Sequence, residues 1–226
     1  MNDLKKLEKE LIEIIEAEKN IFSNSTKQKG GLTNNDVENM QRLKSRKILL
    51  ERKVALLKGE ETAVGCKWDV LWDTGAPLPH IVSNGNKVFL IYYIGEHNPD
   101  WDGTTCKVID PAQEIIRPLA LVEFKQCVNF KFGSPNDEVF SGMSLYGKGL
   151  EYYKAHIIEN SKWIKEIKNI NKVHPYFKEE TWLKYKHFLL LFHDEIFECI
   201  AESYNIEVLN LSFDNVLKLA CERVIK

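Results

Sequence analysis

Apolar residues recur every three or four positions through the first part of the chain, as they do along one side of an amphipathic helix. The first series comprises Leu4, Leu7, Leu11, Ile14 and Ile21. A second series follows the polar cluster 34–36 and ends before Gly59, and it comprises Met40, Leu43, Leu50, Val54 and Leu57. The polar segment 23–32, with two adjacent glycines, separates the series. The pattern predicts a coiled-coil-like antiparallel helical hairpin over residues 1–59.

The two predicted helices carry opposite charge. Residues 1–22 hold six Asp or Glu against four Lys, whereas residues 23–58 hold nine Lys or Arg against three acids. Opposite charges beside matching seams favour antiparallel pairing. Because two helices bury little surface alone, we expect residues 1–58 to dock on the main domain or a protein partner, or to self-associate. The basic run 44–47 has acidic neighbours, so a solvated face is favoured over a nucleic-acid contact.

From residue 60 onward, short apolar runs alternate with turns rich in Gly, Pro and Asn. The Asn84-Gly85 pair predicts a β-hairpin within 79–94, since both residue types tolerate positive φ. The remaining pattern predicts a strand over 120–132, loops over 95–110 and 133–138, a helix over 150–171, a short helix over 179–184 and a final helix from Phe213, capped by Ser212. Residues 60–226 are therefore predicted to form an α+β domain, an antiparallel sheet with flanking helices.

One segment of this domain is ambiguous. Residues 182–199 satisfy a helical spacing, yet the apolar run 188–192 also fits a buried strand. We predict two strands on either side of residues 193–195, with a helix over 187–201 as the open alternative.

Composition narrows the class of protein. The chain has 226 residues, of which 44% are hydrophobic and 28% charged, as in soluble globular proteins. Its apolar runs are shorter than the roughly 20 residues of a membrane span, and its first residues lack the apolar core of a signal peptide. We therefore expect a cytoplasmic protein and no membrane partner. Five cysteines without a C-x-x-C pair favour reduced thiols over disulfides or a zinc ribbon.

Five short motifs occur in order: FGSPNDE at 132–138, LYGKGL at 145–150, NSKWI at 160–164, VHP at 173–175 and FHDEIFEC at 192–199. In this order the chain resembles a family of uncharacterised bacterial proteins, over residues 68–202. The family has no established activity, so the resemblance implies a contiguous domain rather than a function. The family often carries His-Pro where this chain has Met143-Ser144, so no role should depend on a histidine there.

The candidate chemistry centres on residues 193–199, where charges interrupt an apolar run. His193 with Asp194 could act as a general base, and Glu195 and Glu198 could bind a ligand. A tight turn with ion pairs explains the same residues without chemistry, and we favour it. Cys199 has no neighbouring cation in sequence to lower its pKa, which disfavours a nucleophile.

A second candidate lies in the polar loop after the strand that ends near residue 132. Asn136, Asp137 and Glu138 could bind a divalent cation through oxygen atoms, although capping or a polar rim suits them better. If this loop met His193 in space, the combined residues would form a credible site. The sequence does not settle that distance.

Two functions follow from these observations. The first is a non-enzymatic protein-interaction module, because a coiled-coil-like hairpin precedes a compact domain without a complete catalytic signature. By analogy, an immunity or defence role would suit such a protein. The alternative is a metal-dependent hydrolase that uses a cluster of His193, Asp194, Asp137 and Glu138. We predict no organic cofactor and leave a divalent metal ion as the open alternative.

Overall fold

A computed structural model describes residues 2–27, 32–85, 87–95 and 116–226. The chain divides into two compact units. The first contains residues 1–65, 142–151 and 158–161, and the second contains residues 66–141, 152–157 and 162–226. The first unit thus extends beyond the predicted hairpin of residues 1–59. The described residues combine an N-terminal helical pair with two antiparallel sheets and further helices, so the predicted α+β class is confirmed.

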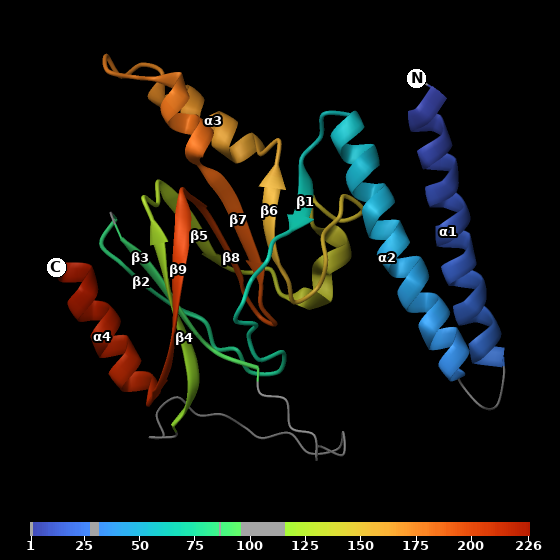
Figure 1. Cartoon of the computed structure of the whole chain (residues 1–226), viewed down its shortest axis with the longest axis horizontal. Coiled ribbons are helices and arrows are strands. Elements are labelled where there is room, and N and C mark those ends of the chain that lie inside the picture. The colour runs from blue at the N-terminus through green and yellow to red at the C-terminus, as the bar shows by residue number, and fades with distance from the viewer. Residues whose placement is uncertain (1, 28–31, 86, 96–115) are drawn as a thin grey trace. The chain divides into compact units, whose positions relative to one another are not determined.

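The first unit is built on two long helices that lie side by side and run in opposite directions (Figure 1). Helix α1 spans Asn2–Lys27 and α2 spans Asn34–Leu57, followed by strand β1 at Thr62–Gly65. The Thr33 side chain accepts a hydrogen bond from the Asp36 N–H, and the Asp36 side chain accepts one from the Thr33 N–H, so Thr33 caps the start of α2. Ile14, Leu50 and Val54 are buried, as their positions on the seams require, and Ile48, which lies outside the predicted seam, is buried too.

The second unit contains two antiparallel sheets. One has the strand order β2-β3-β4-β9, and the other has, within this unit, the order β6-β7-β8-β5. The first sheet comprises β2 (His80–Ser83), β3 (Val88–Tyr93), β4 (Arg117–Lys125) and β9 (Ser203–Leu211). The second comprises β5 (Asn129–Gly133), β6 (Ala155–Glu159), β7 (Lys186–Leu191) and β8 (Ile196–Ala201). The helices are α3 (Lys162–Asn171) and α4 (Phe213–Ile225), with 3-10 turns η1 (Asp137–Gly142) and η2 (Glu179–Lys184).

The core of the second unit has two layers because strands alternate their side chains between faces. One cluster joins the inner faces of the two sheets and includes Leu90, Val122, Phe124, Phe188, Phe197 and Cys199. The other cluster joins the opposite face of the first sheet to α4 and includes Phe89, Ile91, Leu121, Phe213 and Val216. Every residue of β3 is buried, since both of its faces are covered. Figure 1 shows α4 lying along this sheet.

Several predicted elements differ from the structure. The predicted strand over 120–132 is two strands, β4 and β5, and the predicted helix over 150–171 is β6 followed by α3. Strand β9 was not predicted, although Tyr204, Ile206 and Val208 alternate with Asn205 and Glu207. Most of the predicted loop over 95–110, and part of the predicted turn over 23–32, lie outside the described residues. None of the described helices combines the length and the apolarity needed to cross a membrane.

Candidate functional site

Residues 192–195 form the tight turn that joins β7 to β8. The Phe192 N–H donates to the Glu195 carbonyl at 3.0 Å, which closes the turn. The strands on both sides are regular, with Phe188 opposite Cys199 and Leu191 opposite Ile196. The two predicted strands are confirmed, and the alternative helix over 187–201 is wrong. The turn leaves Asp194 exposed and His193 half-exposed.

The polar loop after β5 meets this turn. The Asp137 N–H donates to the His193 carbonyl at 3.0 Å, and His193 Nδ1 lies 2.9 Å from Asp137 Oδ2. The same carboxylate accepts a hydrogen bond from the Tyr153 hydroxyl. All three residues belong to the second unit. The proximity that the sequence left open is therefore present, and we call Asp137, Tyr153 and His193 the Asp–Tyr–His network.

The network fixes the protonation of its members. The hydrogen bond from Tyr153, and then that from His193, lowers the pKa of Asp137. The hydrogen bond to Asp137 raises the pKa of His193, and it also raises the pKa of Tyr153 to about 12. Because an ionised carboxylate only accepts hydrogen bonds, the proton must sit on His193 Nδ1. In the neutral imidazole the other nitrogen, Nε2, is then the proton acceptor, on a side chain that is 41% exposed.

Tyr153 is the member that the sequence analysis missed. Its backbone has φ of +52°, in the left-handed region that bulky residues rarely adopt. Such residues persist only where their surroundings hold them, and they cluster at functional sites. No local sequence motif predicts a tyrosine in the left-handed conformation, so only the three-dimensional contact with Asp137 identifies Tyr153 as a member of the network.

Four of the remaining predicted site residues lie around this network, and the fifth, Glu198, lies elsewhere in the second unit. Glu138 and Asp194 are exposed and near enough to His193 for their charges to raise its pKa further. Glu195 is half-buried, and this burial, together with the charge of Asp194, raises its pKa. Asn136 is half-buried at the start of the loop. These residues surround the network but do not extend its hydrogen bonds among the described residues.

Glu198 belongs to a different contact on the outer face of the β7–β8 pair. Its carboxylate lies 2.8 Å from His187 Nε2, and Lys131 is directly opposite Glu198 on β5. Burial alone would favour the neutral acid, but the hydrogen bond and charge of His187 outweigh it and lower the pKa of Glu198. The edge of His187 packs on Trp163 of α3, and Lys131 Nζ lies 3.9 Å from the centre of the Trp163 ring. This arrangement attaches α3 to the sheet.

Two chemistries considered from the sequence find little support in the geometry. Cys199 is fully buried, and this burial raises the pKa of its thiol, which opposes a nucleophilic role. In the part of the chain that the structure describes, no three His, Cys, Asp or Glu side chains converge as a metal ion would need. Asp137 and His193 supply two donors, so a metal ion here would require ligands from elsewhere.

The network predicts a specific titration. We expect His193 to titrate above its ordinary value of 6.5 and Asp137 below its ordinary value of 3.8. A histidine whose pKa is raised in the folded state stabilises the fold below pH 6.5, and this effect is lost as the pH rises through the folded-state pKa. A carboxylate whose pKa is lowered stabilises the fold above pH 3.8, and this effect is lost as the pH falls through the folded-state pKa. The network should therefore stabilise most between these two values. NMR titration of the His193 ring measures this directly.

Two substitutions distinguish the effect of the hydrogen bond on the His193 pKa from the effect of nearby negative charge. Asp137→Asn should return the His193 pKa towards its ordinary value, because the charged acceptor is gone. Asp194→Asn removes an equal charge that makes no hydrogen bond to the ring and should change the pKa less. Equal shifts in the two variants would contradict the geometry.

Comparison with protein-family models, with curated proteins and with solved structures gave no match to this chain. The resemblance to an uncharacterised bacterial family therefore stays a prediction, and the functional argument rests on the residues themselves.

Proposed function

We propose that this chain is an interaction protein that assembles with a second copy of itself through the α1–α2 hairpin. The observation that carries the proposal is the number of large apolar side chains left exposed on this hairpin. Ile12, Phe22, Val37, Leu49, Leu56 and Leu57 are each at least 40% exposed. Exposed apolar surface of this kind marks association sites.

The exposed leucines of α2 form a continuous surface. Leu49 and Leu56 are two turns apart and thus lie on one face of the helix, whereas Leu57, which was predicted for the seam with Leu50 and Val54, is 60% exposed near the end of the helix. At about 100° per residue, this face points away from Glu51 and Val54, which face the interior of the unit. A two-helix hairpin cannot cover this face with its own residues, whereas a four-helix bundle of two copies would.

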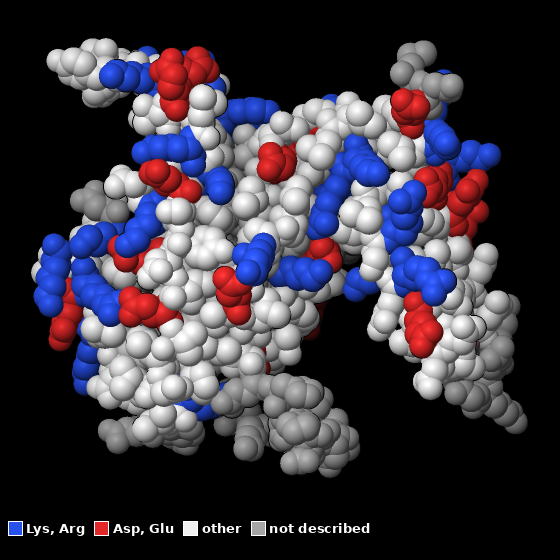
Figure 2. Space-filling model, in the orientation of Figure 1, with Lys and Arg blue, Asp and Glu red and all other residues white. Residues whose placement is uncertain are grey.

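Charge favours a second copy as the occupant. Within one copy, acidic residues of α1 already pair with basic residues of α2: Glu10 with Arg46 at 2.6 Å, Glu18 with Lys47 at 2.9 Å and Glu8 with Lys58 at 2.8 Å. Figure 2 shows acidic and basic side chains interspersed along the hairpin. Lys44 and Lys53 remain exposed on α2, and Glu16 is among the further acids of α1. An α2 helix is therefore complementary to the α1 helix of another copy.

We expect sedimentation velocity to show a dimer of the full chain and a monomer of the Leu49→Lys/Leu56→Lys double variant. Burying a leucine stabilises by about 1.5–3 kcal/mol, so losing two should weaken association at least ~100-fold. Both side chains are already exposed, so the far-UV circular dichroism of the variant should stay unchanged.

The matched control is Ile170→Lys/Val173→Lys in the second unit, where both side chains are 60% exposed or more. This variant carries the same added charge and should remain a dimer. A wild-type chain that is monomeric up to millimolar concentration, or a double leucine variant that still dimerises, would refute the proposal.

A second candidate function is hydrolysis with His193 as the general base, favoured by the Asp–Tyr–His network alone. The hydrogen bond at Nδ1 orients the ring and leaves Nε2 to take a proton from water, as in other histidine bases held by a carboxylate. The titration described above is its first test. If Asp137→Asn leaves the His193 pKa unchanged, the carboxylate does not tune this histidine and the candidate fails.

A further inference from the structure

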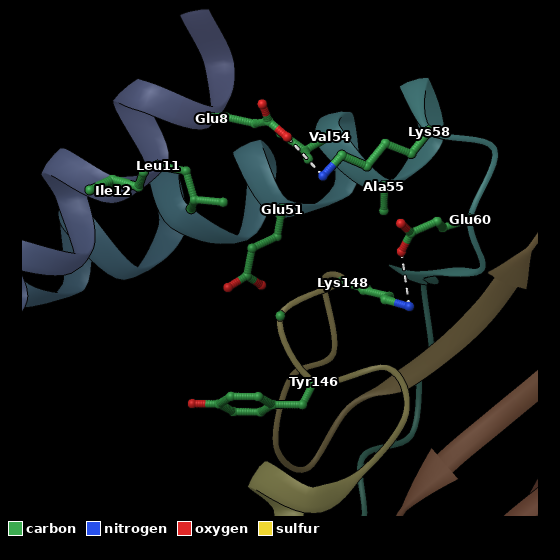
Figure 3. A pocket seen from close by; sticks show the side chains of 11 residues that line it. Glu8, Leu11, Ile12, Glu51, Val54, Ala55, Lys58, Glu60, Tyr146 and Lys148 are labelled. Carbon is green, nitrogen blue, oxygen red and sulfur yellow. Dashed lines mark ion pairs between the residues drawn. The ribbon is translucent and has the colours of Figure 1, made fainter. Parts of the chain in front are cut away.

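The first unit contains a pocket of about 460 Å³ between α1, α2 and the loop at residues 146–148 (Figure 3). This volume lies within the range of roughly 300–1,000 Å³ that is typical of small-molecule sites. Its apolar wall is formed by Leu11, Ile12, Val54 and Ala55. All of its lining residues belong to the first unit. On α2 the pocket uses the interior face and not the face of Leu49 and Leu56, while Ile12 of α1 lines the pocket and is also exposed.

One lining residue is a buried acid. Glu51 is only 6% exposed, and Figure 3 shows its carboxylate extending from α2 into the space in front of Tyr146. A single hydrogen bond, a long one of 3.3 Å from the Gly149 N–H, reaches one of its oxygens among the described residues. Burial raises the pKa of Glu51, and the Gly149 hydrogen bond only partly offsets this. A carboxylate in such a position gains most from a cation that enters the pocket.

The surrounding charges are already matched to one another. At the rim of the pocket Glu8 pairs with Lys58 at 2.8 Å, and Glu60 pairs with Lys148 at 2.9 Å (Figure 3). The two basic residues whose charge acts on Glu51 are engaged as well, since Lys47 pairs with Glu18 and Arg52 with Glu151. Within the described residues these four pairs leave Glu51 as the acid without an ion-pair partner. The pocket thus combines apolar walls with a buried acid that makes no ion pair among the described residues.

We infer that this pocket binds a small organic cation, an ammonium group on an apolar body, with Glu51 as the group that holds the ammonium. The apolar body packs on Leu11, Val54 and Ala55. The ammonium supplies the charged donor that Glu51 lacks, and an ion of this kind forms a charge-assisted hydrogen bond with a carboxylate.

The test compares three probes of equal length on the full chain at neutral pH: hexylammonium, hexan-1-ol and hexanoate. Binding is measured by NMR from the amide shifts of Ala55 and Gly147. We expect hexylammonium to bind at least about tenfold more tightly than hexan-1-ol, and hexanoate to bind least, since a hydrogen bond to a charged group outweighs a neutral one.

Three variants assign the effect. Glu51→Gln should bring hexylammonium and hexan-1-ol to within about twofold of each other while hexan-1-ol still binds. Glu13→Gln removes an equal charge from an exposed position of α1 and should keep the preference. Ile12→Trp, at an exposed position of α1 that tolerates a larger side chain, should fill the pocket and weaken the binding of all three probes.

Equal affinities of hexylammonium and hexan-1-ol for the wild-type chain would overturn the inference. So would a preference that survives Glu51→Gln, or the absence of binding by every probe. Circular dichroism of each variant checks that the α1–α2 hairpin is intact.

Discussion

Phe197→Ala is expected to lower the free energy of unfolding of the second unit by about 3–5 kcal/mol, which is typical of a phenylalanine removed from a packed core. Phe197 is fully buried between the two sheets, with its ring centre 5.0 Å from that of Phe124 and 6.4 Å from that of Phe130. The cavity left by the ring would be lined by side chains on two sheets, which cannot collapse without shifting whole strands. Denaturant unfolding followed by tryptophan fluorescence measures the change, since every tryptophan lies in the sequence of this unit.

The control for this prediction sits directly across the β5–β8 pair. Phe132 is the register partner of Phe197, yet it lies near the end of the edge strand and is 40% exposed. Phe132→Ala should therefore lower the unfolding free energy by only about 1 kcal/mol or less. Equal losses in the two variants would mean that the core does not lie between the sheets as described.

Gly149→Ala should destabilise the first unit by roughly 2–5 kcal/mol, from two separate causes. Gly149 has φ of +87°, and an L side chain in this region costs about 1–2 kcal/mol. An added Cβ would also lie 2.5 Å from the Ala63 carbonyl oxygen and would overlap the side chain of Arg52. Backbone on one side and an ion-paired arginine on the other cannot move aside freely, which adds about 1–3 kcal/mol. Far-UV circular dichroism reports the unfolding, since α1 and α2 are the longest helices described.

Substitutions at two nearby glycines distinguish the conformational cost from the steric cost. Gly147 also has positive φ, at +70°, but an added Cβ would meet nothing within 4 Å, so Gly147→Ala should show only the conformational cost. Gly142 has neither feature, and its substitution should be nearly neutral. If Gly147→Ala were as damaging as Gly149→Ala, the close approach to Ala63 would not be the cause.

The elements that the sequence predicted well are those in which local chemistry and tertiary packing agree. The α1–α2 hairpin follows from the spacing of apolar residues such as Leu50 and Val54, which are buried as expected. The β2–β3 hairpin follows from Asn84 and Gly85, whose glycine has φ of +87°. In both cases the signal lies within a few residues of the feature, so no long-range contact is needed to read it.

The elements that the sequence missed depend on distant partners. In residues 150–171, Ile157 fits a helical spacing, but its pairing with Phe188 of β7 makes the segment a strand. Strand β9 exists because it pairs along the whole length of β4, from Arg117 opposite Leu211 to Lys125 opposite Ser203. These long-range pairings cannot be deduced from a short window of sequence, although the alternation of apolar and polar residues over 204–208 is a local strand signal that the sequence analysis missed.

The candidate site was predictable in its residues and unpredictable in its assembly. Asp137 and His193 stood out as polar residues beside apolar runs, yet 56 positions separate them, and the hydrogen bond between them depends on how β5 leads into the loop and β7 into the turn. Glu51 drew no attention because one acid in an amphipathic helix is ordinary. Its burial becomes visible only when the loop around Gly149 is placed against α2.

The order of strands in the first sheet has a consequence for synthesis on the ribosome. Strands β2, β3 and β4 emerge first, yet β4 lacks its outer neighbour until residues 203–211 are made, and the apolar side of β3 lacks its cover until α4 follows. While residues 126–202 are synthesised, the nascent chain therefore exposes an incomplete sheet with an apolar face. Such long-range pairing folds slowly and exposes the chain to aggregation, so we expect this protein to depend on chaperones that shield emerging polypeptides.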